Sequence, residues 1–256
     1  MRVTTAAAAA ALHLLCVTAT PTPPSPPSPQ QPPPYFILTG DSTVAVGGGW
    51  GDGFLSFLLA PPAAGTNPAK SGATTVSFRA EGRWDAALAG VRAAAAAAEY
   101  GPVVTMQFGH NDQKPDKGIS PDQFQGNLKR MAKEVLEAGG TPILITSLTR
   151  RTFSGGKVVQ NLETERLRAI AAAKEVGAAH LDLNAASTAY INAVGDANGR
   201  LYDLAQGDRT HLNAAAGVVF GRMVVDLLLE KRPDFGRYFR ENRTITNAIR
   251  SGVFVI

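Results

Sequence analysis

The residue with the clearest capacity for chemistry is Ser42, which follows an apolar run over residues 35–40 and precedes the glycines 47–49. A serine at the end of a buried strand, among small residues, presents its hydroxyl at the sheet edge, where α/β proteins bind ligands. Such a hydroxyl becomes a nucleophile once a base takes its proton. The alternative is a strand followed by an ordinary helix cap, because Asp and Ser are common N-cap residues.

A base and its carboxylate stand together near the other end of the chain, in Asp208-Arg209-Thr210-His211. Their spacing on a single turn can set the Asp208 carboxylate against one imidazole nitrogen of His211 and leave the other nitrogen facing a serine. The carboxylate would then fix the tautomer and stabilise the imidazolium. The alternative is that Asp208 or Thr210 only caps the helix that follows.

Two further positions could donate hydrogen bonds to an oxyanion. Asn111, within the Gly-His-Asn-Asp stretch 109–112, has an amide that could point into a cleft or form an Asx turn. Gly72 could offer its backbone N–H or simply permit a tight turn. A donor of this kind typically contributes about 10²-fold to 10³-fold to the rate of acyl transfer.

These residues need a scaffold that brings distant loops together, and the hydrophobic pattern predicts one. Apolar runs predict strands, and 3.6-residue periodicity predicts helices between them. Because parallel strands need long crossovers, the alternation predicts a three-layer α/β/α sandwich around a five-stranded parallel sheet. The eight repeats of a TIM barrel, the alternative, are not present. The predicted strands are 35–40, 69–71, 103–108, 142–147 and 179–183, and the helices 53–60, 84–100, 121–138, 162–176 and 212–229.

Composition supports one globular domain from residue 35 to 256. The chain has 256 residues, of which 45% are apolar and 18% charged, so it can bury a substantial core. Its formal charge of +4 comes from 25 Lys and Arg against 21 Asp and Glu, without a long basic run. Nucleic-acid binding is therefore not expected, and the basic segment from about 231 is expected to be a solvated peripheral helix or tail.

The N-terminal segment resembles a secretory signal peptide over residues 1–19. Met1-Arg2 precedes an apolar run, and Val17 and Ala19 have the spacing that a signal peptidase reads. The run is too short for a membrane span in the mature protein, so a secreted, extracellular protein without a membrane partner is expected. Cys16 is the only cysteine, and a Pro-rich linker or tail follows over 20–34. Asn242 begins the one glycosylation sequon.

Taken together, the motifs resemble the SGNH (GDSL-type) hydrolases. Gly40-Asp41-Ser42 is similar to the family's first block, Gly72 with the residues before it to the second, 109–112 to the third and 208–211 to the fifth. Within the family the chain looks most like rhamnogalacturonan acetylesterases, through Gly-Asp-Ser-Thr-Val, the 81–84 stretch, 107–112 and Thr-His-Leu-Asn at 210–213. Ala73-Thr74 replaces an Arg-Ser pair common in those enzymes, which removes one possible contact to an anionic substrate.

The resemblance implies a flavodoxin-like SGNH fold and assigns the roles. Ser42 would be the nucleophile, His211 the base and then acid, and Asp208 its orienting carboxylate. The oxyanion hole would consist of the Ser42 N–H, the Gly72 N–H and the Asn111 side chain. No metal or cofactor is implied.

The function expected from this resemblance is that of a monomeric, secreted esterase that removes acetyl groups from a pectic polysaccharide, with rhamnogalacturonan as the first choice of substrate. Two alternatives remain open: an SGNH lipase or general short-chain esterase, and a non-catalytic carbohydrate-binding wall protein. Acyl-chain preference separates the first alternative from a deacetylase. The presence of the Ser42, Asn111, Asp208 and His211 set disfavours the second.

Arginines near the predicted strand ends could bind the carboxylate of an acidic sugar, because a guanidinium pairs with a carboxylate in bidentate fashion. The candidates are Arg79, Arg83 and Arg150, with Arg151 beside the last. Trp50 and Trp84 are either sugar-stacking platforms or core residues.

Overall fold

A computed structural model describes residues 1–4 and 32–256. The predicted signal peptide beyond residue 4, and the Pro-rich segment up to residue 31, lie outside the described residues. Among the helices of the described part, none is long and apolar enough to cross a membrane.

The centre of residues 32–256 is a parallel sheet with the strand order β2-β1-β3-β4-β7. Its strands are β1 (Pro34–Gly40), β2 (Ala64–Thr66), β3 (Gly101–Gln107), β4 (Thr141–Ile145) and β7 (Ala179–Leu181). Each neighbouring pair is parallel, with Phe36 beside Val103 and Thr105 beside Ile143. This order is the flavodoxin-like one, so the predicted α/β sandwich with five parallel strands is confirmed.

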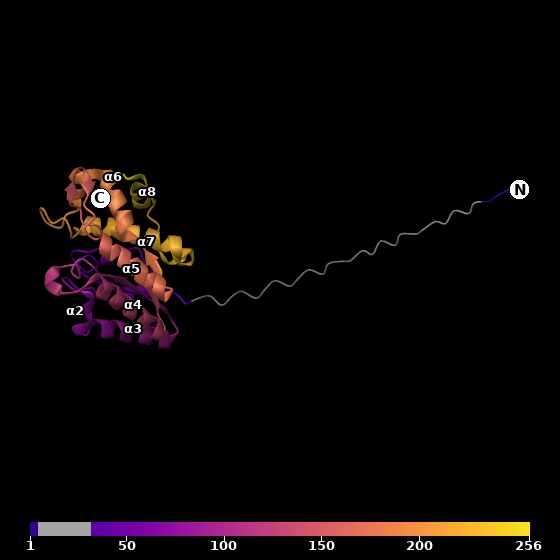
Figure 1. Cartoon of the computed structure of the whole chain (residues 1–256), viewed down its shortest axis with the longest axis horizontal. Coiled ribbons are helices and arrows are strands. Elements are labelled where there is room, and N and C mark those ends of the chain that lie inside the picture. The colour runs from indigo at the N-terminus through magenta and orange to yellow at the C-terminus, as the bar shows by residue number, and fades with distance from the viewer. Residues whose placement is uncertain (5–31) are drawn as a thin grey trace. The chain divides into compact units, whose positions relative to one another are not determined.

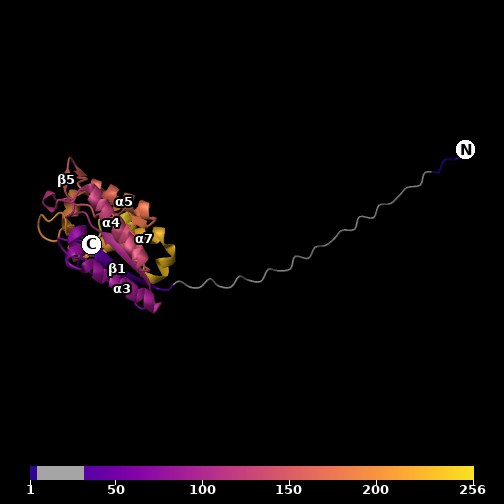
Figure 2. The ribbon, with the colours of Figure 1, turned by 60° about the horizontal axis from the view of Figure 1, so that its bottom comes forward.

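Helices cover both faces of the sheet (Figure 1). On one face lie α2 (Thr75–Ala80), α3 (Arg83–Ala97), α4 (Pro121–Glu137) and α5 (Glu163–Val176); on the other lie α1 (Gly51–Ser56), α6 (Leu183–Gly199), α7 (Ala214–Lys231) and α8 (Arg243–Ser251). Strand side chains alternate between the two cores: Phe36 and Leu38 point to the α7 side, and Ile37 points to the α3 side. Figure 2 shows β1 beside α3.

Local sequence explains where the long helices begin. Ser120 and Gln123 form a capping box at the start of α4, which also has Pro121 in its first turn. The Asn213 side chain accepts a hydrogen bond from the Ala216 N–H and caps α7. Helix α1 packs on α7 at glycines, since a Cβ on Gly53 would stand 2.0 Å from the Gly217 carbonyl oxygen.

Three features differ from the sequence predictions. The second strand lies at β2, not at 69–71, and residues 69–71 instead lead into the turn at Gly72. Helices α2 and α6 were not predicted. The C-terminal segment is not peripheral, because Phe235, Tyr238 and Phe239 are buried in the core on the α7 side.

The remaining elements are short. A hairpin pairs β5 (Phe153–Ser154) with β6 (Lys157–Val158), and three 3₁₀ helices cover Pro115–Lys117, Arg200–Tyr202 and Pro233–Tyr238. Trp50 and Trp84 are each 0% exposed, so both are core residues rather than sugar-stacking platforms.

Candidate active site

The candidate site lies at the carboxyl ends of β1 and β3, where the strand order reverses. Chain connections leave β1 in one direction and β3 in the other, which opens a crevice at this point in sheets of this kind. Ser42 follows β1 and Asn111 follows β3. The topology alone therefore brings two candidate groups, 69 positions apart in sequence, to the same edge.

A buried chain of hydrogen bonds fixes the turn that carries Ser42. The Asp41 carboxylate accepts bonds from the Thr43 N–H at 2.9 Å and the Thr43 hydroxyl at 2.7 Å. Gln107, the last residue of β3, donates to the same hydroxyl and accepts from the Trp50 indole N–H at 2.8 Å. Burial alone would raise the pKa of Asp41, but nearby His110 and the Thr43 bonds outweigh it and lower that pKa. The turn is thus held by an ionised carboxylate that is fully buried.

Ser42, His211 and Asp208 form a continuous hydrogen-bonded triad. The Ser42 Oγ lies 2.8 Å from His211 Nε2, and His211 Nδ1 lies 2.8 Å from Asp208 Oδ2. Ser42 is 8% exposed, so its hydroxyl is near the surface and mostly shielded from water. The second oxygen of Asp208 accepts the backbone N–H groups of Thr210 and His211 at 3.0 and 2.9 Å. Asp208 therefore has both of the roles considered for it. One carboxylate oxygen accepts the backbone N–H groups of the turn, and the other contacts the imidazole of His211.

Electrostatics keep Asp208 ionised. Partial burial by itself would raise the pKa of Asp208, but the hydrogen bonds from the His211 N–H, the His211 ring and the Thr210 N–H more than compensate and lower the pKa. A carboxylate in this state stabilises an imidazolium and selects the tautomer with its proton on Nδ1. His211 Nε2 is then free to accept a proton from Ser42.

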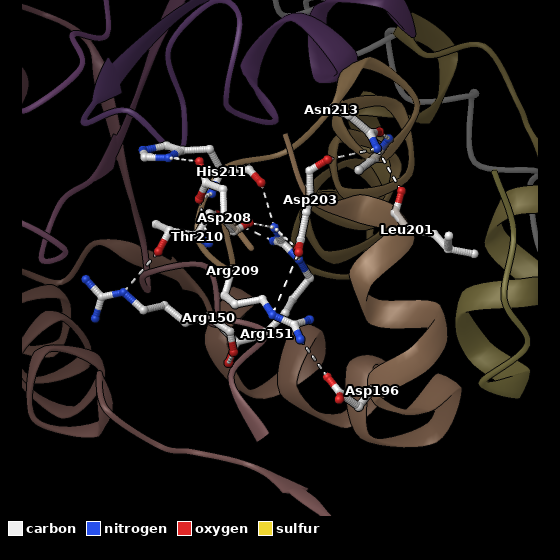
Figure 3. A network of polar contacts seen from close by, with 12 residues as sticks. Arg150, Arg151, Asp196, Leu201, Asp203, Asp208, Arg209, Thr210, His211 and Asn213 are labelled. Atoms are coloured by element: carbon white, nitrogen blue, oxygen red, sulfur yellow. Dashed lines mark hydrogen bonds and ion pairs between the residues drawn. The ribbon is translucent and has the colours of Figure 1, made fainter. Parts of the chain in front are cut away.

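Arg151 holds the loop that presents Asp208 and His211 (Figure 3). Its side chain is fully buried and donates to Asp203 Oδ1 at 3.1 Å. The same nitrogen donates to the carbonyls of Asp208 at 3.0 Å and His211 at 2.6 Å. Arg151 was a candidate for substrate binding, but every one of these bonds is internal, so it acts as a support for the histidine loop.

Two unpaired backbone donors and one side-chain amide surround the triad. Among the described residues, no partner accepts a hydrogen bond from the N–H of Ser42 or of Gly72. Gly72 has φ +79°, a conformation that glycine adopts without strain. Residues on both sides of Gly72 bond to the segments that carry Ser42 and Asn111. The Lys70 N–H donates to the Gly40 carbonyl at 3.0 Å. The Ala73 carbonyl accepts from the Asn111 amide, also at 3.0 Å.

The Asn111 amide is oriented from two sides. Its Nδ2 gives one hydrogen to Ala73, and Lys114 Nζ donates to its Oδ1 at 2.8 Å. The second hydrogen on Nδ2 remains for a ligand. Gly109, two residues before Asn111, lets the loop pass close to Ser147, because a Cβ on Gly109 would stand 2.4 Å from the Ser147 hydroxyl oxygen.

Two side chains of the Gly-His-Asn-Asp loop, those of His110 and Asp112, are buried. Asp112 accepts bonds from the Thr75 N–H and hydroxyl at 2.8 and 2.6 Å and thereby holds the start of α2. Burial raises the pKa of Asp112 to about 6, with a smaller contribution from the charge of Asp41. His110 Nδ1 is 3.6 Å from Asp41 Oδ2, and its side chain is only 3% exposed. Among the described residues, neither the His110 nor the Asp112 side chain forms a hydrogen bond with the triad.

The three candidate substrate-binding arginines differ in their distance from the triad loops. Arg79 pairs with Glu134 of α4 at 2.6 Å, and Arg83 with Glu81 at 3.5 Å, so neither contacts the triad loops. Arg150 does: it donates to the Thr210 hydroxyl at 3.3 Å and to the His110 carbonyl at 3.4 Å. Its guanidinium therefore lies between the loop of Asn111 and the loop of His211.

The site also contains residues whose roles the sequence did not reveal. The roles of Gln107, Lys114 and Arg151 depend on partners distant in sequence or in the next turn. Gln107 belongs to the 107–112 stretch that resembles the family, and Lys114 lies two positions after it, but neither pattern assigned a role to these side chains. Within the described residues, no group of three His, Cys, Asp or Glu side chains is arranged to hold a metal ion.

The chain is similar to known proteins in sequence and in fold. Residues 38–216 match the model of the GDSL-like lipase/acylhydrolase family. The chain is 36% identical over 172 residues to the rhamnogalacturonan acetylesterase RhgT of Bacillus subtilis, a match that covers 64% of this chain and 70% of RhgT. It is 27% identical over 182 residues to the uncharacterised esterase YxiM of the same organism, and spans 46% of that protein.

Solved structures share the fold. The crystal structure of Bacillus subtilis YxiM superposes with a TM-score of 0.68 at 25% identity, over 78% of this chain and 57% of that one. An acetylxylan esterase from Geobacillus stearothermophilus, Axe2, superposes with a TM-score of 0.55 at 16% identity, over 82% of this chain and 97% of that one. At that identity the second likeness concerns the fold.

Proposed function

Because the chain belongs to the GDSL-like lipase/acylhydrolase family and is a carboxylic ester hydrolase, we propose that it deacetylates a cell-wall polysaccharide, with rhamnogalacturonan as the preferred substrate. The observation that carries the catalytic part is the unbroken chain of 2.8 Å contacts from Ser42 through His211 to Asp208. The similarity to RhgT supports the choice of substrate.

The reaction begins when Ser42 Oγ attacks the acetyl carbonyl carbon and His211 Nε2 takes the hydroxyl proton. The Ser42 N–H, the Gly72 N–H and the free Asn111 N–H then stabilise the tetrahedral oxyanion. Collapse of this intermediate breaks the bond to the sugar oxygen, which receives the proton from His211. The products of this half-reaction are acetyl-Ser42 and the free sugar hydroxyl.

Water completes the cycle. His211 takes a proton from a water molecule that attacks acetyl-Ser42, and returns it to Ser42 Oγ as acetate leaves. Asp208 stabilises the imidazolium formed in both halves. The same donors serve both oxyanions, so loss of any one should slow acylation and deacylation alike.

Arg150 supports an acidic polymer as the substrate. It lies between the two loops that carry Asn111 and His211. Its bonds to Thr210 and His110 are long, at 3.3 and 3.4 Å, and its Nη1 donates to the Gln113 amide oxygen at 2.8 Å. A guanidinium placed this way can pair with the carboxylate of the acetylated galacturonate unit itself. Arg150→Gln is expected to raise KM for acetylated rhamnogalacturonan at least threefold and to leave hydrolysis of acetylated xylan, a neutral polymer, nearly unchanged.

The deciding experiment compares acetate release from acetylated rhamnogalacturonan, acetylated xylan and a small aryl acetate by the wild type and Ser42→Ala. We expect the highest kcat/KM among the polymers on rhamnogalacturonan, and no activity in the variant. Release from the aryl ester alone would retain the esterase and reject the polysaccharide. Equal activity in both proteins would reject Ser42 as the nucleophile.

Export forms part of the proposal, because residues 1–19 have the pattern of a secretory signal. Expression of the full chain in a secreting host, followed by N-terminal sequencing of protein from the medium, tests it. We expect a mature N-terminus near residue 20. Retention of the intact chain inside the cells would count against export.

A further inference from the structure

A hollow of about 380 Å³ opens beside the catalytic histidine, on the side of α1 and α7. Its walls are the glycine turn at 47–49, the exposed face of α1 with Asp52 and Ser56, the start of α7 with Val218, and Leu204 from the histidine loop. We infer that this hollow, which we call the glycine groove, is a subsite for a neutral sugar unit next to the acetylated one. The inference rests on the proposed function and extends it.

The glycine groove is continuous with the catalytic centre. Gly48 belongs to its wall, and a Cβ on Gly48 would stand 3.6 Å from both Cβ and Cδ2 of His211. The Leu212 N–H donates to the Gly48 carbonyl at 2.9 Å, which locks the glycine turn to the histidine loop. A sugar whose acetyl group reaches Ser42 therefore has its neighbouring unit within reach of this hollow.

The absence of side chains on the turn is what leaves room there. Of the three glycines, only Gly47 has a positive φ, so its conformation favours glycine. Gly48 has an ordinary φ, and no backbone atom would stand closer than 3.6 Å to a Cβ added there. A side chain at Gly48 would thus fit the backbone but project beside His211, where it would occupy the space of the ligand.

The charges in the groove select against an acidic ligand. Among its lining residues the only ionisable group is Asp52, which is exposed and accepts a hydrogen bond from Asn67 at 2.9 Å. A carboxylate accepts hydrogen bonds from sugar hydroxyls and repels a uronate. Leu204 is 46% exposed and, with Val218, offers an apolar surface for a sugar face or a deoxysugar methyl group.

The two sides of the cleft are therefore chemically different. Arg150 lies on one side of the histidine loop, and Asn213, which also lines the glycine groove, lies on the other (Figure 3). The cationic side suits a uronate, and the groove suits a neutral sugar. A polymer that contains both a neutral deoxysugar and a uronic acid can satisfy both sides at once.

The test fills the groove from two directions. Val218→Trp acts from α7, and Ser56→Trp acts from α1, where Ser56 is exposed and its hydroxyl only bonds back to the Gly53 carbonyl. The control is Leu136→Trp on α4, because Leu136 is 49% exposed and belongs to the opposite helical layer. For each full-length protein, kcat/KM is measured on acetylated rhamnogalacturonan, a small aryl acetate and the matching aryl octanoate.

We expect both groove variants to lower the ratio of kcat/KM on rhamnogalacturonan to that on the aryl acetate at least tenfold, while the control keeps the wild-type ratio. A ratio within twofold of wild type in both variants would overturn the subsite and leave the proposed function standing. A loss confined to the octanoate would show that the hollow holds an acyl chain, and would also overturn the subsite. A wild type that cleaves the aryl acetate but no polysaccharide would reject both proposals.

A charge variant tests selectivity without filling the groove. Asp52→Asn keeps the side-chain shape and removes the only negative charge of the lining. We expect the variant to raise kcat/KM on acetylated homogalacturonan, in which every unit is acidic, at least threefold relative to acetylated xylan. An unchanged ratio would refute the role of Asp52 in excluding acidic sugars.

Discussion

Replacement of Asn111 by Ala gives the sharpest test of the oxyanion hole, because the structure separates its catalytic effect from its structural one. One hydrogen of the Asn111 amide bonds the Ala73 carbonyl at 3.0 Å, and the other has no partner among the described residues and is the proposed oxyanion donor. Removal of the first should reduce the free energy of unfolding by about 1 kcal/mol. Removal of the second should lower kcat by about 10²-fold to 10³-fold, which corresponds to roughly 3–4 kcal/mol.

The assay is steady-state hydrolysis of an aryl acetate, with thermal unfolding measured in parallel. KM should change little, because the donor acts on the charge that develops in the transition state. Asn127→Ala is the matched control. The Asn127 amide also donates one bond to the segment after Gly72, to the Thr75 hydroxyl at 3.0 Å, but it lies on α4 and not in the triad loops.

Lys114→Met completes the argument, since it leaves the Asn111 amide in place and removes the bond that fixes it at 2.8 Å. We expect about a tenfold fall in kcat, in line with the ~1.5 kcal/mol of a hydrogen bond to a charged group. If Asn111→Ala retains kcat within threefold of wild type while Ser42→Ala is inactive, the amide does not bind the oxyanion and the reasoning fails.

Three further predictions concern the support of the site and the fold. Arg151→Met should lower kcat more than tenfold and should also lower the melting temperature, because it removes the ion-pair partner of the buried Asp203 carboxylate. A normal kcat would refute the supporting role of Arg151. Asp112 has a pKa of about 6 in the folded protein against 3.8, so it binds its proton more tightly when folded, and its own contribution to stability should fall as the pH rises from 4 to 6 by up to about 3 kcal/mol. Asp112→Asn should remove that fall, and denaturant unfolding at pH 4, 5, 6 and 7 measures it; an identical pH profile would contradict the assignment. Gly53→Ala should destabilise the protein by more than about 3 kcal/mol, because the added Cβ would meet the Gly217 carbonyl. The control Gly126→Ala, on α4 with open space around it, should stabilise the protein by about 0.5–1 kcal/mol. Equal melting temperatures for the two variants would refute the close packing of α1 on α7.

The sequence predicted the sheet well where strands are buried on both faces. The segments at 35–40, 103–108 and 142–147 are continuous apolar runs, because their residues supply both cores in alternation. β2 escaped detection because it is a three-residue edge strand, Ala-Gly-Thr, with little strand propensity. Its pairing with β1 is a tertiary contact that no local pattern encodes.

Helix α6 was missed for a related reason. It begins directly after β7, where Asp182 accepts the Ala185 N–H at 3.3 Å and caps it, so the end of the strand and the start of the helix merge in the sequence. Its residues include Asn, Ser and Thr, and its φ/ψ angles break at Gly195. Such a composition lowers local helix propensity, and the helix forms because Tyr190 and Ile191 pack into the core.

The candidate site could be read from the sequence to the extent that its parts are local. Asp208 and His211 stand on one turn, so their spacing alone suggested a pair. Arg151 could not be assigned in the same way, because its guanidinium meets Asp203 across 52 positions. The same limit explains why the sequence placed Arg79 at the substrate site. Its partner Glu134 is 55 positions away on α4, and the ion pair between them holds the Arg79 side chain against that helix.

The nucleophile turn shows why such distant contacts matter for chemistry. Ser42 makes no side-chain hydrogen bond to its own turn; its place is set by Asp41 and Thr43 on either side, and these are held in turn by Gln107 of β3. The turn and the loop of Asn111 therefore share one strand end as their reference. A shift of β3 against β1 would move Asn111 relative to Ser42, and the bonds from Gln107 to the Ser42 turn oppose such a shift. The glycine turn is bonded to the same groups, because the Trp50 indole donates to Gln107 and the Gly48 carbonyl accepts from the Leu212 N–H. A change of shape at the glycine groove would therefore reach the reacting groups.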